Sequence, residues 1–213
     1  MTDRSPVNPD DLRRAATLGR AALEPALDRD WTTLAREMEW TCRRTLDHIP
    51  DALVFYAGQL ATRASERRPP VRNGDPARSV AELLDVLEAA AAVLAAVAEA
   101  APAGARAFHA AGMADPEGFL AMGCAEILLH TDDIVAALGV PFEPPADLCA
   151  RVGRRIFPWA PIEADPWDAL RWAGGRIALP GHDRLDDSWW WHCAPLAEWD
   201  GAVKRRTAPP AWR

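Results

Sequence analysis

Glu126, His130 and Asp133 lie in the stretch 122–138, which contains no proline and repeats apolar residues at helical spacing. On a helix, Glu126 and His130 are four residues apart and share one face, about one turn from each other. A carboxylate oxygen and an imidazole nitrogen placed in this way can both reach one divalent ion. Asp133 can then accept the second ring N–H of His130 and orient it, or it is simply an acid on the helix surface.

A glutamate four residues before a histidine also occurs without a metal, as a surface contact or beside a buried histidine. A catalytic metal centre needs three protein ligands plus water, so this pair requires a third ligand from another element. Of the remaining histidines, only His48 lies on a predicted long helix. His109 lies in a connection, and the other two lie in a turn and in a tryptophan-rich segment. His48 is therefore the candidate third ligand.

Length and composition predict one domain, or one domain with an extension. The chain has 213 residues, 49% of them hydrophobic, and a formal net charge of −7. An acidic chain without a long basic run argues against binding to nucleic acid or to an anionic membrane. The short cluster 204–206 is expected to be a solvated tail. The N-terminus lacks the apolar core of a signal peptide, so we expect a cytoplasmic protein with no membrane partner.

The four cysteines are widely separated and form no Cys-x-x-Cys pair. Their spacing fits no zinc-finger pattern, and reduced, buried thiols are the simplest interpretation. Cys124 lies about 200° around its helix from Glu126, and Cys42 lies off the face of His48. Neither is expected to bind the metal.

The first two-thirds of the chain is predicted to consist of helices. The expected helices cover 10–23, 41–64, 79–100 and 115–138, with Pro50 expected to kink the second helix or to mark a start within it. Capping residues mark the starts at Thr41, Ser79 and Asp115. The segment 101–114 is expected to be a connection broken by proline and glycine. Four helices with connections of moderate length predict a four-helix bundle.

After Pro141 the sequence changes character. Helices are expected over 144–157 and 165–172, and 176–179 and 188–193 are candidates for short strands. Eight of the ten tryptophans lie from Trp159 onward, so this tail is expected to pack against the rest of the protein. The predicted domains are a metal-binding bundle over 1–140 and a C-terminal extension over 141–213.

Together these features resemble the DinB-like superfamily, and within it the branch of mycothiol-dependent maleylpyruvate isomerases. Trp40 precedes His48 by eight residues, as a tryptophan precedes the first metal ligand in that family. The loop 112–115 and the Glu-x-x-x-His stretch from Glu126 to His130, with Asp133 trailing it, resemble the family's later helix. The two helices lie about eighty residues apart. The match covers roughly residues 10–140.

The resemblance implies a mainly α fold, a DinB-like four-helix bundle that holds a divalent ion, commonly zinc. Carried onto this chain, the ligands are His48, Glu126 and His130, and a glutamate in the second position points to the mycothiol branch. A thiol bound to such an ion loses its proton and becomes a nucleophile. The implied function is a mycothiol-type S-transferase or isomerase, in which a low-molecular-weight thiol attacks a small electrophile.

The substrate pocket is expected at the end of the bundle that carries the metal, with Trp40, Tyr56 and His109 as candidate walls. Two other functions remain open: a metal-dependent hydrolase or natural-product tailoring enzyme that uses no mycothiol, and a non-catalytic helical binding protein. Proteins of this superfamily often dimerise through their helices, so a homodimer and a monomer are both left open.

Overall fold

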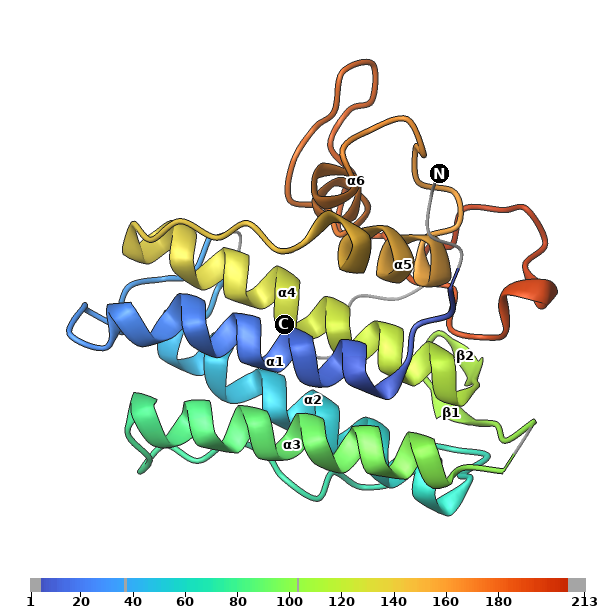
Figure 1. Cartoon of the computed structure of the whole chain (residues 1–213), viewed down its shortest axis with the longest axis horizontal. Coiled ribbons are helices and arrows are strands. Elements are labelled where there is room, and N and C mark those ends of the chain that lie inside the picture. The colour runs from blue at the N-terminus through green and yellow to red at the C-terminus, as the bar shows by residue number, and fades with distance from the viewer. Residues whose placement is uncertain (1–4, 37, 103, 207–213) are drawn as a thin grey trace.

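The computed structural model describes residues 5–36, 38–102 and 104–206, and in these ranges the chain is mainly helical, as predicted (Figure 1). The elements follow the order α1 (Pro9–Leu23), η1 (Glu24–Ala26), α2 (Cys42–Thr62), α3 (Val80–Ala100), β1 (Ala107–His109), β2 (Gly112–Ala114), α4 (Pro116–Leu138), α5 (Ala146–Ile156), α6 (Pro166–Ala173) and η2 (Leu196–Glu198).

The predicted helix starts are confirmed at α2, α3 and α4. The hydroxyl of Thr41 caps α2, and Ser79 and Glu82 form the reciprocal capping box of α3. Asp115 caps α4, with proline in the first turn, and α4 ends where Gly139 adopts a left-handed φ of 72°. The helix start expected near Pro50 is wrong, because α2 continues through it. Within the described ranges, no helix is long and apolar enough to cross a membrane.

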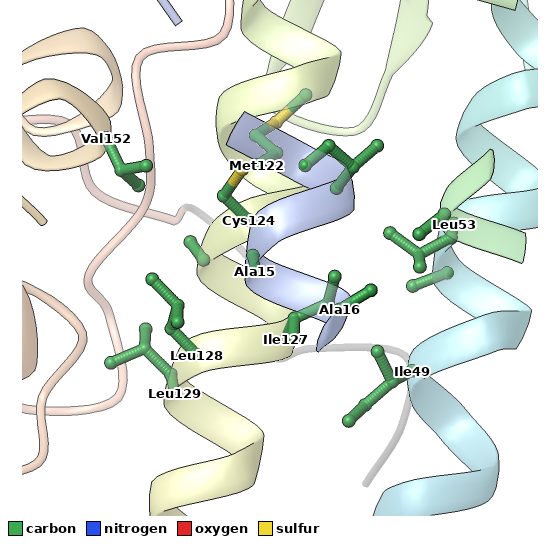
Figure 2. Close-up of a cluster of buried hydrophobic side chains, with 14 of the residues drawn as sticks. Ala15, Ala16, Ile49, Leu53, Met122, Cys124, Ile127, Leu128, Leu129 and Val152 are labelled. Atoms are coloured by element: carbon green, nitrogen blue, oxygen red, sulfur yellow. The ribbon is translucent and has the colours of Figure 1, made fainter. Parts of the chain in front are cut away.

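The helix α4 lies at the centre of the protein. It packs against α1 and α2 on one side and against α5 on another, and α3 contacts α1 and α2 (Figure 1). In Figure 2, Ile127 points toward α1, whereas Leu128 and Leu129 point to the other side of α4. Every residue from 118 to 135 is buried, so the polar residues of this helix need partners inside the protein.

The segment before α4 folds into a short antiparallel hairpin instead of the expected irregular connection. In β1 and β2, Ala107 pairs with Ala114 and His109 pairs with Gly112. The N–H of Phe108 donates to the carbonyl of Ala64 at 2.7 Å, which fastens the hairpin to the end of α2. These strands of three residues are too short for a two-residue periodicity to reveal them.

The C-terminal extension contains the two expected helices, α5 and α6, but the two candidate strands are wrong. In the described part of the extension, the only β pairings are single bridges, from Leu179 to His182 and from Trp189 to Arg205. A turn through Pro180 and Gly181 separates the first pair and allows no longer ladder. The tryptophan side chains at 189–191 pack on different neighbours instead of alternating between two faces of a sheet.

A buried arginine holds the extension on α4. Arg155 is 2% exposed, forms an ion pair with Asp115, and donates to the carbonyl oxygens of His192 and Cys193 at 3.3 and 3.4 Å. At Gly118, a Cβ atom would lie 2.2 Å from the carbonyl oxygen of Cys193, so only glycine allows this approach. The segment 189–191, called the tryptophan segment below, is thereby fixed beside the β1–β2 hairpin.

Candidate metal centre and its cavity

The structure brings the three predicted metal ligands together. His48 comes from α2, and Glu126 and His130 come from consecutive turns of α4. One ligand atom from each residue lies within 4.8 Å of the other two, so the group can hold a metal ion. The Oε2 atom of Glu126 is 3.2 Å from Nε2 of His130 and 3.7 Å from Nε2 of His48.

These separations fit a single ion that all three ligand atoms bind in tetrahedral geometry. Two ligand atoms that each lie about 2.1 Å from a tetrahedral zinc ion are about 3.4 Å apart. The two measured separations lie on either side of this value. The rings of His48 and His130 meet edge to face with centroids 5.4 Å apart, so they do not block the space between the nitrogens. The donor set of two imidazoles and one carboxylate is one that zinc accepts.

A tyrosine holds the second carboxylate oxygen of Glu126. The hydroxyl of Tyr56 donates to Oε1 at 2.8 Å, which leaves Oε2 facing the two histidines. Burial raises the pKa of Glu126, but hydrogen bonds from His130 and His48 outweigh it and hold the pKa well below its usual range. The carboxylate is therefore ionised, the form that a metal ligand requires.

Asp133 orients His130 from behind. Its carboxylate is fully buried, and Oδ2 lies 3.2 Å from Nδ1 of His130, which leaves Nε2 facing Glu126. Arg176, from the C-terminal extension, donates to both oxygens of Asp133 at 2.7 and 3.3 Å. Burial raises the pKa of Asp133, but the charge of Arg176 and the bond to His130 lower it below its usual value. A helix-surface position for Asp133 is excluded, because the side chain is inaccessible.

Arg176 is the residue of the candidate site that the sequence did not reveal. It follows Gly174 and Gly175, where added Cβ atoms would lie 2.8 Å from Leu129 and from Trp189 respectively. Gly174 therefore lets the backbone approach α4, and Gly175 lets it approach Trp189, and Arg176 follows at a place from which its guanidinium reaches Asp133. A buried aspartate on a helix that is covered on all sides indicates that a cationic side chain must pair with it. It does not identify which of the 24 lysines and arginines supplies it.

A cavity of about 1000 Å³ opens beside the triad. Trp40, Tyr56 and His109, the three predicted wall residues, all line it. The ring of Trp40 meets the His48 ring edge to face at 5.0 Å, which supports the half-buried histidine. Opposite walls come from the β1–β2 hairpin and from the tryptophan segment of the extension.

The prediction that residues 204–206 form a solvated tail is wrong. Lys204, Arg205 and Arg206 line the cavity, and the guanidinium carbon of Arg206 lies 3.9 Å from the ring centroid of Trp190. The N–H of Arg206 donates to the carbonyl of Ser188 at 2.7 Å, which returns this segment to the tryptophans. Cationic side chains thus form part of the cavity wall, although the net charge of the protein is negative.

Comparison of the chain with protein-family models, with curated proteins and with solved structures finds no match.

The chain's own thiols are poor nucleophiles. All four cysteines are buried and form no disulfide. Burial raises the pKa of Cys42 to about 11, of Cys149 to about 12 and of Cys193 to about 11, and raises that of Cys124 well above its usual value. Because the thiolate is the reactive form, thiol chemistry in the cavity needs a thiol from outside the chain.

His109 is buried in the cavity wall as a neutral ring. Burial lowers its pKa from about 6.5 to about 4; the charge of Glu126 on α4 opposes this shift, and that of Arg206 on the extension adds to it. The unfolded chain therefore binds a proton at His109 between these values and the folded chain does not. Its contribution to folding stability is complete above pH 6.5 and is lost as the pH falls toward 4.

We expect the loss of folding stability at low pH to be visible when the wild type is compared with the His109→Gln variant, which cannot titrate at this position. Between pH 7 and pH 5, the wild type should lose about 2 kcal/mol more free energy of unfolding than the variant. Urea unfolding of both proteins at pH 7, 6 and 5 measures the difference, in which all other titrating groups cancel. Parallel pH dependences would contradict a neutral, buried His109.

Proposed function

We propose that this protein is a metal-dependent enzyme that activates a low-molecular-weight thiol, of the mycothiol type, for attack on a small electrophile. The observation that supports this most strongly is the convergence of His48, Glu126 and His130 within 4.8 Å at the wall of a cavity of about 1000 Å³. The reaction class is an S-transferase or an isomerase. In an isomerase, addition of the thiolate to a double bond and its later elimination change the geometry of that bond.

The arrangement of the helices is consistent with a DinB-like four-helix bundle built from α1, α2, α3 and α4. In this proposal α2 supplies the first ligand and α4 the other two, as the resemblance to the mycothiol-dependent branch implies. The proposed ion is zinc, because it is commonly bound by histidine and carboxylate ligands and keeps a fourth position open for a substrate. When bound, zinc supplies a positive charge that stabilises a thiolate at that position.

The residues around the triad prepare it for this role. Tyr56 restrains one oxygen of Glu126, which favours binding of the ion through the other oxygen alone. Asp133 holds the ring of His130 so that Nε2 faces the ligand cluster. Two neutral imidazoles and one carboxylate cancel only one of the two charges of a zinc ion, and the remaining charge favours an anionic thiolate.

An external thiol is proposed because the chain supplies no reactive one. The four cysteines are buried, and burial keeps their thiols protonated at neutral pH. None of them belongs to the ligand cluster. The cavity of about 1000 Å³ has room for both a thiol cosubstrate and a small electrophile.

The test combines metal analysis with a thiol-dependence assay. Protein purified without chelator is analysed for metal, then incubated with a panel of small electrophiles with and without mycothiol. The proposal expects about one divalent ion per chain and conjugation or isomerisation only when both metal and mycothiol are present. Removal of the metal with a chelator should abolish the reaction, and zinc should restore it.

Two results would contradict the proposal in different ways. Turnover that needs the metal but is indifferent to mycothiol would favour a hydrolase or a tailoring enzyme. Absence of metal in the purified protein, together with no binding of added zinc, would rule out the metal centre itself and leave a helical binding protein.

A further inference from the structure

His109 presents an unused hydrogen-bond donor to the cavity. The residue ends β1 and is 6% exposed, and its Nδ1 accepts a hydrogen bond from the N–H of Ala111 at 3.0 Å. That bond occupies the lone pair of Nδ1, so the proton of the neutral ring lies on Nε2. The turn that makes this contact possible depends on Gly112, whose φ of 139° is rarely adopted by other residues.

No described residue accepts a hydrogen bond from Nε2 of His109. The ring is surrounded by aromatic side chains, with centroids 5.4 Å from Tyr56, 6.0 Å from Trp190 and 6.0 Å from Trp191. The indole rings offer no acceptor atom, and the hydroxyl of Tyr56 donates to Glu126 and forms no hydrogen bond with Nε2 of His109. His109 lines the cavity, so a ligand oxygen bound there can accept a hydrogen bond from this N–H.

The position of His109 connects this donor to the proposed metal centre. Tyr56 contacts the imidazole ring of His109 and binds Glu126 through its hydroxyl. His109 and the triad therefore lie on either side of one tyrosine, in the wall of the same cavity. A molecule attacked by a nucleophile held at the triad would lie within reach of this wall.

We infer that His109 donates a hydrogen bond through Nε2 to an oxygen atom of the electrophile that gains negative charge when the thiolate attacks. The inference rests on the proposed function and narrows its substrates to electrophiles whose charge develops on oxygen. In a conjugated carbonyl compound, a sulfur–carbon bond forms at the β carbon and the π electrons move to the carbonyl oxygen. In an epoxide, the sulfur–carbon bond forms while a carbon–oxygen bond breaks and leaves its electron pair on oxygen.

In both reactions the proton released when the thiol ionises is finally returned to the product through solvent, so atoms and charges balance. His109 need not transfer a proton, and its low pKa of about 4 keeps it a neutral donor throughout the physiological range. A preorganised donor aimed at a developing oxyanion stabilises the transition state more than the ground state. Displacement of a halide differs, because the negative charge leaves on the halide and no oxygen gains charge.

The first experiment uses two variants and three electrophiles. His109→Phe removes the donor, whereas His109→Gln retains an N–H near the place of Nε2, and both lose the contact with Ala111. With mycothiol and the zinc-loaded enzyme, kcat/KM is measured for 2-cyclohexen-1-one, styrene oxide and 4-nitrobenzyl chloride. We expect His109→Phe to lose about 100-fold on at least one of the two oxygen electrophiles and less than about threefold on the chloride, with His109→Gln losing less than His109→Phe.

The second experiment needs neither metal nor turnover. Imidazole ¹H–¹⁵N spectra of the metal-free protein should show His109 neutral and protonated on Nε2 from pH 5 to pH 8. That N–H resonance should shift when 2-cyclohexen-1-one or styrene oxide is added without thiol.

Three results would overturn the inference: equal losses on all three electrophiles, a proton on Nδ1, or an N–H resonance that neither compound shifts. Failure of the proposed function is distinct, because it would appear as missing metal or as no thiol-dependent turnover of the chloride by the wild type.

Discussion

Replacement of His130 with alanine is expected to abolish tight metal binding without unfolding the protein. The change removes one of three ligands and leaves only His48 and Glu126, while the ion pair between Asp133 and Arg176 remains in place. Loss of a residue that merely supports a ligand costs about 10–100-fold in metal affinity, so loss of the ligand itself should exceed about 100-fold. Metal content after purification, and zinc affinity by competition with a chromophoric chelator, measure the effect.

His182→Ala is the matched control for this experiment. His182 is an exposed histidine in a turn of the extension and does not belong to the ligand cluster. The control should retain the metal content and zinc affinity of the wild type. If His130→Ala keeps its metal as well, the centre does not lie where we place it. If both variants lose it, the loss reflects general damage to the fold.

Much of this centre could be predicted from local sequence patterns. The spacing of Glu126 and His130 specifies one helix face, and the signals at Asp115 and Gly139 define where that helix begins and ends. These interactions span at most one or two helical turns, so neighbouring residues determine them. Local spacing does not specify His48, because the relation between α2 and α4 is a tertiary one. His48 is predicted as the remaining histidine on a predicted long helix and by the resemblance to a family.

The partners of the ligands could not be predicted in the same way. Tyr56 is separated from Glu126 by 70 residues, and Arg176 from Asp133 by 43. No periodicity links such positions, and both contacts depend on how whole elements pack. The sequence predicts Tyr56 only as a wall of the pocket, whereas in the structure its hydroxyl also donates to the carboxylate of Glu126.

The errors at the C-terminal end have a common physical cause. Local propensity predicts strands for the tryptophan-rich segment and a solvated tail for the basic segment. In the structure, Arg206 lies over Trp190, and the described part of this segment forms single β bridges instead of a sheet. Aromatic and cationic side chains of this size gain more from packing on one another than from the local conformations that their sequence favours.

The extension is therefore a structural part of the candidate site. Through Arg176 it neutralises Asp133, which orients His130, and through its tryptophans it contacts the ring of His109. Both the metal centre and the opposite wall of the cavity depend on how this segment docks. Substitutions in the extension should consequently alter metal affinity, although no described residue of the extension belongs to the ligand cluster.

Replacement of Arg176 with methionine tests this dependence. Methionine keeps much of the side-chain volume but leaves the fully buried carboxylate of Asp133 without its cation. Breaking a buried ion pair in this way is expected to lower the free energy of unfolding by about 3–5 kcal/mol. Because Asp133 would no longer be held in place, zinc affinity should also fall by about 10–100-fold. Urea unfolding and chelator competition measure the two effects separately.

The double variant with Arg176→Met and Asp133→Asn distinguishes a positioning role from simple damage to the core. Asparagine removes the buried charge and retains an oxygen that can accept from Nδ1 of His130, so stability should recover partly while zinc affinity stays below that of the wild type. Arg29→Met is the control, since the side chain of Arg29 is 59% exposed, forms an ion pair with Asp28 at the surface and is not among the residues that line the cavity. It should change stability by less than about 0.5 kcal/mol. Wild-type zinc affinity in Arg176→Met would show that the extension does not support the metal centre.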